Sequence, residues 1–433
     1  MTATELLTGT TRVRVQFLAE HAVRVTHGPA DGPFPEDRPW LGHVLLPGAA
    51  LPAEECRLAV DVLDGRIRIC DRAGQVILSE AHPAEVGLGR RQRAVEVDLP
   101  ALDVHLNLRR SVGVRLALQI APGESFYGWG ERFDAFRRER GTLRLKARDA
   151  LPWLQARGNS YSAIPFFLSS RGYGFFFLNS YESTWHIDPQ HGRLEIEAAG
   201  PPADYIVIHG PSFREILSTY TALTGRPPLP PRWAFGLMVT GYPQEHQRIV
   251  LQRAHQHRLS EIPLDVIILD YHWEERFHNF RWRRSLFPDP DEFLAELQSL
   301  GIRVGLIQTP FLNRQNRPGQ RLLLNAIAHN VPRGLERDDE RDLEGYAEAQ
   351  ARGYLAHSDA HWWFGSGGMV DFSNPEAAAW WNGRLRPLYE QGIAFFKNDD
   401  GEYLPPDAHS ALGMDGREYH NLYGFFYGRA LYE

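Results

Sequence analysis

Cysteine is nearly absent from this sequence of 433 residues, which contains only Cys56 and Cys70. Two cysteines cannot build a disulfide framework, and they cannot form a zinc site on their own. They fall on neighbouring predicted strands and could pair with each other. The sequence favours free, buried thiols instead.

Several other features are missing. No uninterrupted apolar run is long enough to span a bilayer, and residues 1–11 lack a basic segment followed by an apolar core, so no secretion signal is visible. The net charge is −7 with both signs interspersed, which provides no basic surface for nucleic acid or an anionic membrane. These absences predict a soluble, cytoplasmic protein with neither partner.

Apolar and aromatic residues are plentiful. The sequence is 43% hydrophobic and has 11 Trp and 16 Tyr, enough to fill the cores of the two or more domains expected at this length. Trp and Tyr also suit surfaces on which sugars stack, although in most proteins they lie in cores or interfaces.

The first part of the chain, residues 1–225, reads as all-β. Val13 and Val15 alternate with polar residues, as do later short runs, and Gly65 and Gly74 mark tight turns between them. Short strands at this spacing predict an N-terminal β-sandwich domain.

A proline-rich linker is predicted at residues 226–231, because proline at this density excludes helix and central strand. Beyond it, strands and helices alternate, which indicates βαβ units and a parallel sheet. The predicted strands are 233–240, 262–270, 303–310 and 392–399, and the predicted helices are 244–259, 289–300, 376–391 and 419–433. Asp289 as N-cap, Pro290 in the first turn and Glu292 in a capping box mark one helix start.

Residues 311–370 do not fit this alternation. Charges crowd residues 333–344 and predict a helical excursion or surface insertion, and the aromatic residues 362–364 are either part of a sugar platform or a hydrophobic anchor. A (β/α)₈ barrel needs eight strands and about 250 residues. Residues 232–433 supply four or five strands, so we expect the first half of an incomplete (β/α)₈ TIM barrel in a longer enzyme.

A short apolar run before Lys397 turns abruptly polar at the carboxyl end of the last predicted strand, where barrels place their chemistry. Side chains alternate along a strand, so Lys397 and Asp399 share a face and the cation favours the ionised form of Asp399. Such a carboxylate suits a nucleophile or an electrostatic stabiliser. The alternative is a surface turn with a salt bridge.

The segment Phe-Lys-Asn-Asp-Asp-Gly-Glu-Tyr-Leu-Pro, residues 396–405, resembles the nucleophile segment of glycoside hydrolase family 31, which reads roughly Lys-Thr-Asp-Phe-Gly-Glu. The catalytic aspartate of the family falls on Asp399 and its lysine on Lys397, whereas Asn398 and Asp400 depart from the pattern. Residues 125–133, 161–168 and 171–177 are similar to other signatures of this family, although most of their aromatic side chains are expected to be plain core.

The resemblance implies further site residues. Asp270, in Leu-Asp-Tyr-His-Trp, falls where the family aspartate binds hydroxyls of the sugar being cleaved, and Trp273, Phe280 and Trp282 around it would form an apolar wall. Asp149 would contact the leaving-group side, although the Trp-Asn that usually precedes it is missing.

The resemblance bears on two further positions. Asp371 is expected to cap or tie the following helix. Ile307 stands where many members carry a tryptophan.

Retaining glycosidases need two carboxyl groups about 5–5.5 Å apart. Asp399 can be the nucleophile, but Asp400 is an unlikely partner because adjacent strand residues point to opposite faces, and Glu402 more plausibly orients its neighbours. The Gly-Asp-Asn segment that carries the acid/base in the family does not follow Asp399. The acid/base is therefore expected outside this chain.

The leading hypothesis is a retaining α-glycosidase that needs no cofactor or metal and hydrolyses α-glucosides or α-xylosides of oligosaccharides. Transglycosidase, α-galactosidase and sulfoquinovosidase specificities stay open within the family. A metal-dependent hydrolase using Asp270, His272, Asp371 and Asp399 is an alternative, although His255 and His257 are two residues apart on a helix and cannot face one site. A non-catalytic carbohydrate-binding protein is the third hypothesis.

Overall fold

The structure is a computed structural model that describes residues 4–8, 11–29, 38–47, 52–82, 84–99, 104–148, 160–241, 246–316, 341–362 and 365–432. The chain divides into two compact units, Met1–Pro227 and Pro228–Glu433. The division falls inside the proline-rich segment for which the sequence predicts a linker.

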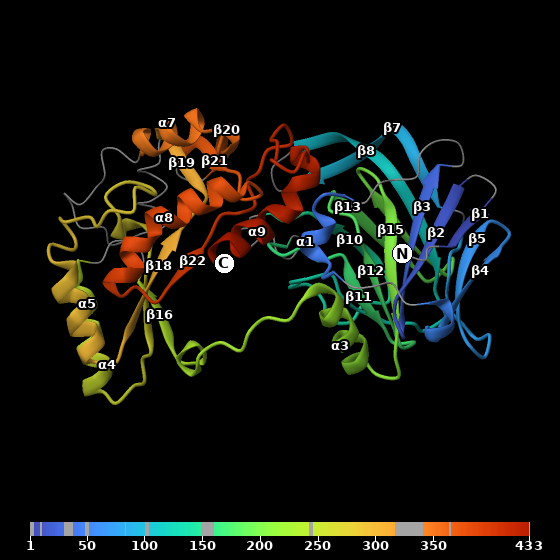
Figure 1. Ribbon diagram of the computed structural model, residues 1–433, viewed down its shortest axis with the longest axis horizontal. Helices are drawn as coiled ribbons and strands as arrows, with labels where there is room; N and C mark the ends of the chain where they lie inside the picture. The colour runs from blue at the N-terminus through green and yellow to red at the C-terminus, as the bar shows by residue number, and fades with distance from the viewer. Residues whose placement is uncertain are drawn as a thin grey trace. The chain divides into compact units, whose positions relative to one another are not determined.

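The first unit consists mainly of antiparallel sheets (Figure 1). A seven-stranded sheet has the order β1 (Thr4–Thr8), β2 (Thr11–Ala19), β3 (Ala22–Pro29), β15 (Ala203–His209), β12 (Tyr173–Phe177), β11 (Phe166–Ser169) and β9 (Phe126–Gly128). A five-stranded sheet has the order β10 (Gly141–Leu145), β13 (Ser183–Asp188), β14 (Arg193–Ala198), β8 (Val104–Gln119) and β7 (Glu85–Leu99). A third sheet contains β4 (Leu58–Leu63), β5 (Arg66–Asp71) and β6 (Val76–Ser79), and the helices are α1 (Leu41–Val44), η1 (Ala53–Glu55) and α3 (Phe213–Thr224).

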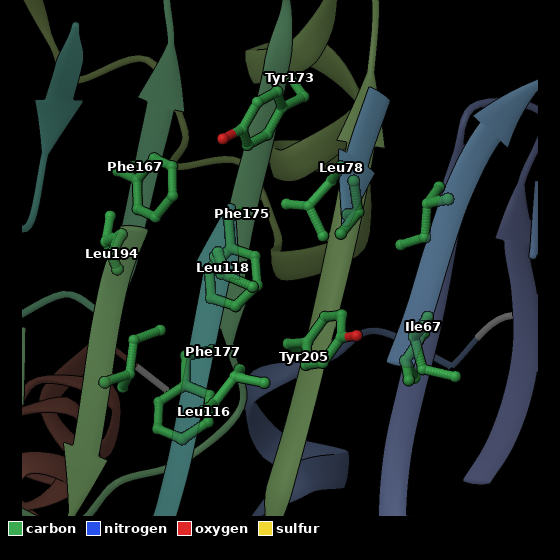
Figure 2. Packing of buried hydrophobic residues seen from close by; sticks show 14 of the residues in the cluster. Ile67, Leu78, Leu116, Leu118, Phe167, Tyr173, Phe175, Phe177, Leu194 and Tyr205 are labelled. Carbon is green, nitrogen blue, oxygen red and sulfur yellow. The ribbon is translucent and has the colours of Figure 1, made fainter. Parts of the chain in front are cut away.

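The core of this unit lies between the two large sheets. The Trp185 ring on β13 packs edge-on against Phe167 and Phe175 of the other sheet, with centroids 6.0 Å away in both cases. Figure 2 shows Phe167 and Phe175 among aliphatic side chains of the facing strands. The alternating strands thus form a β-sandwich, and the aromatic residues of β9, β11 and β12 are largely core, as expected.

Local features of the first unit follow the sequence. Gly65 and Gly74 have φ angles of +74° and +81°, which glycine adopts without steric cost at the two turns. Cys56 and Cys70 are free and buried, as predicted.

The second unit contains a parallel sheet with the order β16 (Met238–Gly241), β17 (Val266–Leu269), β18 (Arg303–Gln308) and β22 (Phe395–Asn398). Its helices are η3 (Arg232–Phe235), α4 (Gln247–Leu259), η4 (Tyr271–Trp273), α5 (Pro290–Ser299), α8 (Pro375–Gln391) and α9 (Gly416–Tyr432). The predicted βαβ alternation is therefore present. Within the described residues the sheet is open, with β16 and β22 at its edges.

Two predicted element boundaries can be compared closely. The expected strand over residues 233–240 is wrong in its first half, because η3 precedes β16. Asp289 caps α5 as predicted, since its Oδ1 accepts the N–H of Glu292 at 3.0 Å. Its own N–H donates to Gln247 Oε1 at 3.4 Å, so the cap includes a contact with α4.

The segment between β18 and α8 forms a small insertion. Its antiparallel sheet has the order β19 (Phe311–Asn316), β21 (Gly365–Val370) and β20 (Leu355–Trp362), accompanied by α7 (Leu343–Ala351). The predicted charged excursion therefore ends in a helix, while residues 317–340 lie outside the described residues. The sheet was not predicted.

None of the helices in the described ranges is both long enough and apolar enough to cross a membrane.

Candidate functional site

The candidate site lies at the carboxyl ends of three neighbouring parallel strands, β17, β18 and β22. Leu269 pairs with Leu306, and Ile307 pairs with Lys397. Extending the first ladder by one residue places Asp270 beside Ile307. Asp270 and Lys397 thus occupy the same row across the sheet, on either side of β18.

Asp399 follows directly after β22. Its backbone N–H donates to the Gln308 carbonyl at 2.9 Å, which continues the ladder one step past the strand. Lys397 Nζ donates to Asp399 Oδ2 at 3.0 Å, so the predicted shared face of these residues is observed. The Asp400 N–H donates to Oδ1 at 3.2 Å. The Asp399 side chain is 42% exposed, so a solute can reach the carboxylate.

Several carboxylates act on the Lys397 ammonium. Burial would lower the pKa of Lys397, but the nearby charges of Asp399, Asp270 and Asp400 outweigh it and raise this pKa above its ordinary value. Lys397 therefore stays cationic at neutral pH. Together with the strand register, which sets Asp270 and Lys397 on either side of Ile307, this groups the predicted site residues Asp270 and Asp399 around Lys397.

The turn after Asp399 differs from the predicted extended chain. β22 ends at Asn398, and Asp400 has a φ of +59°, in the left-handed region that aspartate tolerates better than most residues. The prediction that Asp400 faces away from Asp399 relied on strand alternation, which does not apply beyond Asn398. Asp400 is among the charges that raise the pKa of Lys397.

A tyrosine of α9 completes this region and was not anticipated from the sequence. Tyr427 is buried, and its hydroxyl donates to the Gln308 carbonyl at 3.3 Å. Burial first, and then the carboxylates of Asp399, Asp400, Glu274 and Glu402, raise the pKa of Tyr427 well above its ordinary value. The hydroxyl therefore remains a donor. The spacing of Tyr419, Tyr423 and Tyr427 along one helix face was the available signal.

A buried ionisable pair lies in the loop that carries Asp270. His278 Nδ1 is 3.3 Å from Glu274 Oε1, and both side chains are fully buried. His278 Nε2 is 2.6 Å from Thr309 Oγ1, just past the end of β18. This pair connects the loop after β17 to the end of β18, and sequence analysis did not identify it.

The aromatic residues expected to form a sugar-binding wall lie inside the fold. Trp273 is 1% exposed, and its indole N–H donates to the Ile307 carbonyl at 3.0 Å. Phe280 is 7% exposed and packs edge-on against Trp381 of α8, and Trp282 is 8% exposed. All three rings are buried, so none presents an open face to a sugar. These contacts favour a supporting role for Trp273.

Asp371 follows β21 and is tied to neighbouring backbone, as expected. Its Oδ1 accepts from the Ser373 N–H at 3.0 Å and from the Tyr419 hydroxyl at 3.1 Å. Its Oδ2 accepts from the Ala411 N–H at 2.6 Å. The prediction holds in part: Asp371 ties the chain just before α8 to residue 411 and to α9, whereas α8 itself is capped by Asn374, whose side chain accepts the Glu376 N–H at 3.0 Å.

Trp362 is an anchor of the insertion. Its ring is 4% exposed and stacks on Phe311, with centroids 4.8 Å apart, and its N–H donates to Asn313 Oδ1 at 2.7 Å. Of the two roles considered for residues 362–364, the structure supports the anchor for Trp362. Residues 363–364 and the predicted site residue Asp149 lie outside the described residues.

The alternative metal site of Asp270, His272, Asp371 and Asp399 is not found as a group of ligands within the described residues. His255 pairs with Glu296 of α5, with Nε2 and Oε1 2.7 Å apart, and Asp371 is engaged as above. His272 is 2% exposed. Among the described residues, no group of three or more His, Cys, Asp or Glu side chains is arranged to hold a metal ion.

Comparison with known proteins adds the family. Residues 12–186 match the glycosyl hydrolase 31 N-terminal galactose mutarotase-like domain, and residues 227–433 match the glycosyl hydrolases family 31 TIM-barrel domain. The chain is 32% identical over 330 residues to an α-xylosidase from Lactiplantibacillus pentosus, a match that covers 74% of this chain and 40% of that protein. It is 29% identical over 326 residues to an α-xylosidase from Emericella nidulans, with coverages of 73% and 38%.

Solved structures share the fold. A family 31 dextranase from Flavobacterium johnsoniae, complexed with glucose, has a TM-score of 0.76 at 21% identity, covering 100% of this chain and 52% of the dextranase. An α-xylosidase from a soil metagenome, complexed with xylose, has a TM-score of 0.72 at 19% identity, with coverages of 100% and 62%. The chain therefore spans less than half the length of the two α-xylosidases matched by sequence and about half that of the dextranase. Since both of its units match domains of one family, the chain belongs to glycoside hydrolase family 31.

Proposed function

We propose that this chain provides the nucleophile and part of the sugar-binding site of a retaining α-glycosidase that hydrolyses α-xylosides or α-glucosides of oligosaccharides. One observation carries the proposal. Asp399 presents an accessible carboxylate at the end of β22, held by Lys397 at 3.0 Å, in the same charge cluster as Asp270.

In the proposed first step, an oxygen of Asp399 attacks the anomeric carbon while the bond to the leaving oxygen breaks. That oxygen takes a proton from the acid/base group, and the sugar remains as an ester on Asp399. Water then attacks the same carbon, gives its proton to the acid/base and releases Asp399. Two inversions retain the anomeric configuration.

Lys397 and Asp270 have distinct roles in this proposal. Lys397 holds Oδ2 of Asp399 through a hydrogen bond at 3.0 Å and places a positive charge beside the nucleophile. Asp270 accepts hydrogen bonds from ring hydroxyls as positive charge develops on the sugar. Trp273 supports the loop that presents Asp270, through its bond to the Ile307 carbonyl.

The acid/base is proposed to lie in further polypeptide. The described parallel sheet has four strands, fewer than the eight of a closed barrel, and the chain covers 40% of the α-xylosidase from Lactiplantibacillus pentosus. The relatives named as α-xylosidases and α-glucosidases support xylosides and glucosides as substrates.

The test uses the complete polypeptide and aryl α-xyloside and α-glucoside substrates. Asp399→Ala should abolish turnover, and added azide should partly restore cleavage and give a glycosyl azide of inverted configuration. Asp61→Ala is a matched control, because Asp61 is a half-exposed aspartate on β4 that pairs with Arg68. Near-normal activity of Asp399→Ala would contradict the assignment. Sugar binding without turnover by the unmodified protein would instead favour a carbohydrate-binding protein.

A further inference from the structure

Gln308, the last residue of β18, is completely buried, and both ends of its side-chain amide are engaged. Its Nε2 donates to Asn398 Oδ1 at 2.9 Å. Its Oε1 accepts from the indole N–H of Trp381 in α8 at 2.8 Å. A buried amide with both groups bonded is costly to disturb, because loss of one partner leaves the other group unsatisfied.

The backbone of Gln308 is equally engaged. Its carbonyl accepts from the Asp399 N–H at 2.9 Å and from the Tyr427 hydroxyl of α9 at 3.3 Å. One residue thus contacts the backbone of the proposed nucleophile, the side chain before it and two helices.

The location of these bonds matters because β22 is an edge strand within the described sheet, and its ladder with β18 ends at the pair Gln308 and Asn398. Asp399 lies one residue beyond this last rung. This last pair of residues therefore helps to set the distance between Asp399 and Asp270, which follows β17 on the other side of β18. A misplacement of about 1 Å can reduce the rate of a catalytic step about 100-fold.

We propose that Gln308 is a positioning residue for Asp399, acting through its side-chain bonds to Asn398 and Trp381. The inference rests on the proposed role of Asp399 as nucleophile. The proposal also explains why asparagine can stand at position 398, where the family segment carries threonine. Either side chain has an oxygen that can accept the hydrogen bond from the Gln308 amide.

The first test is Gln308→Leu in the complete polypeptide. It removes both side-chain bonds with little change in volume. We expect kcat to fall on the order of 10- to 100-fold while KM changes less than threefold, since Asp270 still binds the sugar. The rate of glycosyl-enzyme formation in a pre-steady-state burst should fall by the same factor.

Gln391→Leu is the matched control. Gln391 also accepts an indole N–H, from Trp282 at 2.7 Å, and donates to a side-chain oxygen, Asp291 Oδ1 at 2.6 Å, but at the opposite end of α8. It should lower the thermal midpoint without a selective loss of kcat. If Gln308→Leu lowers the midpoint equally but keeps kcat within twofold, the proposal is overturned.

Position 398 gives a second test that does not require Gln308→Leu to fold. Asn398→Thr retains an oxygen that can accept a hydrogen bond from Gln308. Asn398→Val has the shape of the threonine variant but lacks that oxygen. We expect kcat of the threonine variant to exceed that of the valine variant at least fivefold, and equal values would contradict the inference. Near-normal activity of Asp399→Ala would instead contradict the proposed nucleophile. Failure of the proposed function can therefore be told apart from failure of the inference about Gln308.

Discussion

The ammonium of Lys397 lies 3.0 Å from the carboxylate of Asp399, two residues further along the same edge of β22. Both side chains are nearly half exposed, so the pair is open to water and to solutes rather than buried for stability. Exposed ion pairs contribute little to folding, so we expect loss of this pair to change the proposed chemistry more than the stability.

Lys397→Met should lower kcat/KM of the complete enzyme on the order of 10- to 100-fold, because it removes the ammonium that holds Asp399 Oδ2 at 3.0 Å. Lys397→Arg keeps a positively charged donor and serves as the control, with a smaller loss expected. Steady-state kinetics of both variants measures the difference. An unchanged kcat/KM in Lys397→Met would show that Lys397 does not position the carboxylate.

The alkaline limb of the kcat/KM–pH profile of the complete enzyme should not arise from Lys397. Its neighbouring carboxylates raise its pKa, so the charged form is retained at neutral pH and is lost only as the pH rises through that raised value.

Asp371→Asn should destabilise the second unit by about 1–3 kcal/mol, because one of its oxygens becomes a donor facing backbone N–H groups. Hydrogen exchange of the α9 amides measures this change, since Tyr419 of α9 bonds to Asp371. Exposed Asp61 provides the control, and Asp61→Asn should change stability by less than about 0.5 kcal/mol. Unaltered α9 exchange in Asp371→Asn would contradict the structural role.

The left-handed backbone of Asp400 predicts an unusual order of substitutions. Asp400→Gly should be more stable than Asp400→Ala by about 1 kcal/mol, because a Cβ is unfavourable at a φ of +59°. Asp407 is exposed and lacks a positive φ, so alanine should equal or exceed glycine there. Thermal unfolding of the glycine and alanine variants at both positions tests this reversal. If Asp400 had ordinary backbone geometry, glycine would not be the more stable substitution there.

The 433-residue chain alone should give no burst of phenol with a dinitrophenyl α-glycoside. The second unit exposes apolar side chains beside its first strand, with Phe235 69% and Leu237 43% exposed, and its described edge strands lack neighbours on one side. Limited proteolysis should cut residues 228–433 before 1–227. One equivalent of released phenol would show that the site is formed without further polypeptide.

Much of this arrangement could be predicted locally. The shared face of Lys397 and Asp399 follows from strand alternation, and the Asp289 cap follows from residue type. The alternation rule does not apply at Asp400, because the strand stops two residues earlier. Local pattern also cannot reveal Gln308, whose partner Trp381 is separated from it by 73 residues.

The insertion shows another limit. The sequence Gly-Ser-Gly-Gly at 365–368 is typical of a loop, yet it forms β21. A Cβ on Gly367 would collide with the Leu312 carbonyl, and one on Gly368 would overlap the Leu355 side chain. The close approach of neighbours that are distant in sequence requires glycine at these positions. The glycine-rich composition therefore suggests a loop where the structure has a strand.

Helix α8 is bonded to the rest of its unit at two points: Trp381 in its N-terminal half bonds to Gln308, and Gln391 at its C-terminal end bonds to Trp282. Each residue added to a helix advances it about 1.5 Å and turns it about 100°. A single insertion or deletion between Trp381 and Gln391 would therefore break one of these two hydrogen bonds. Homologous chains should keep this interval at constant length, while variation in length accumulates between β18 and α8, where the chain leaves the sheet.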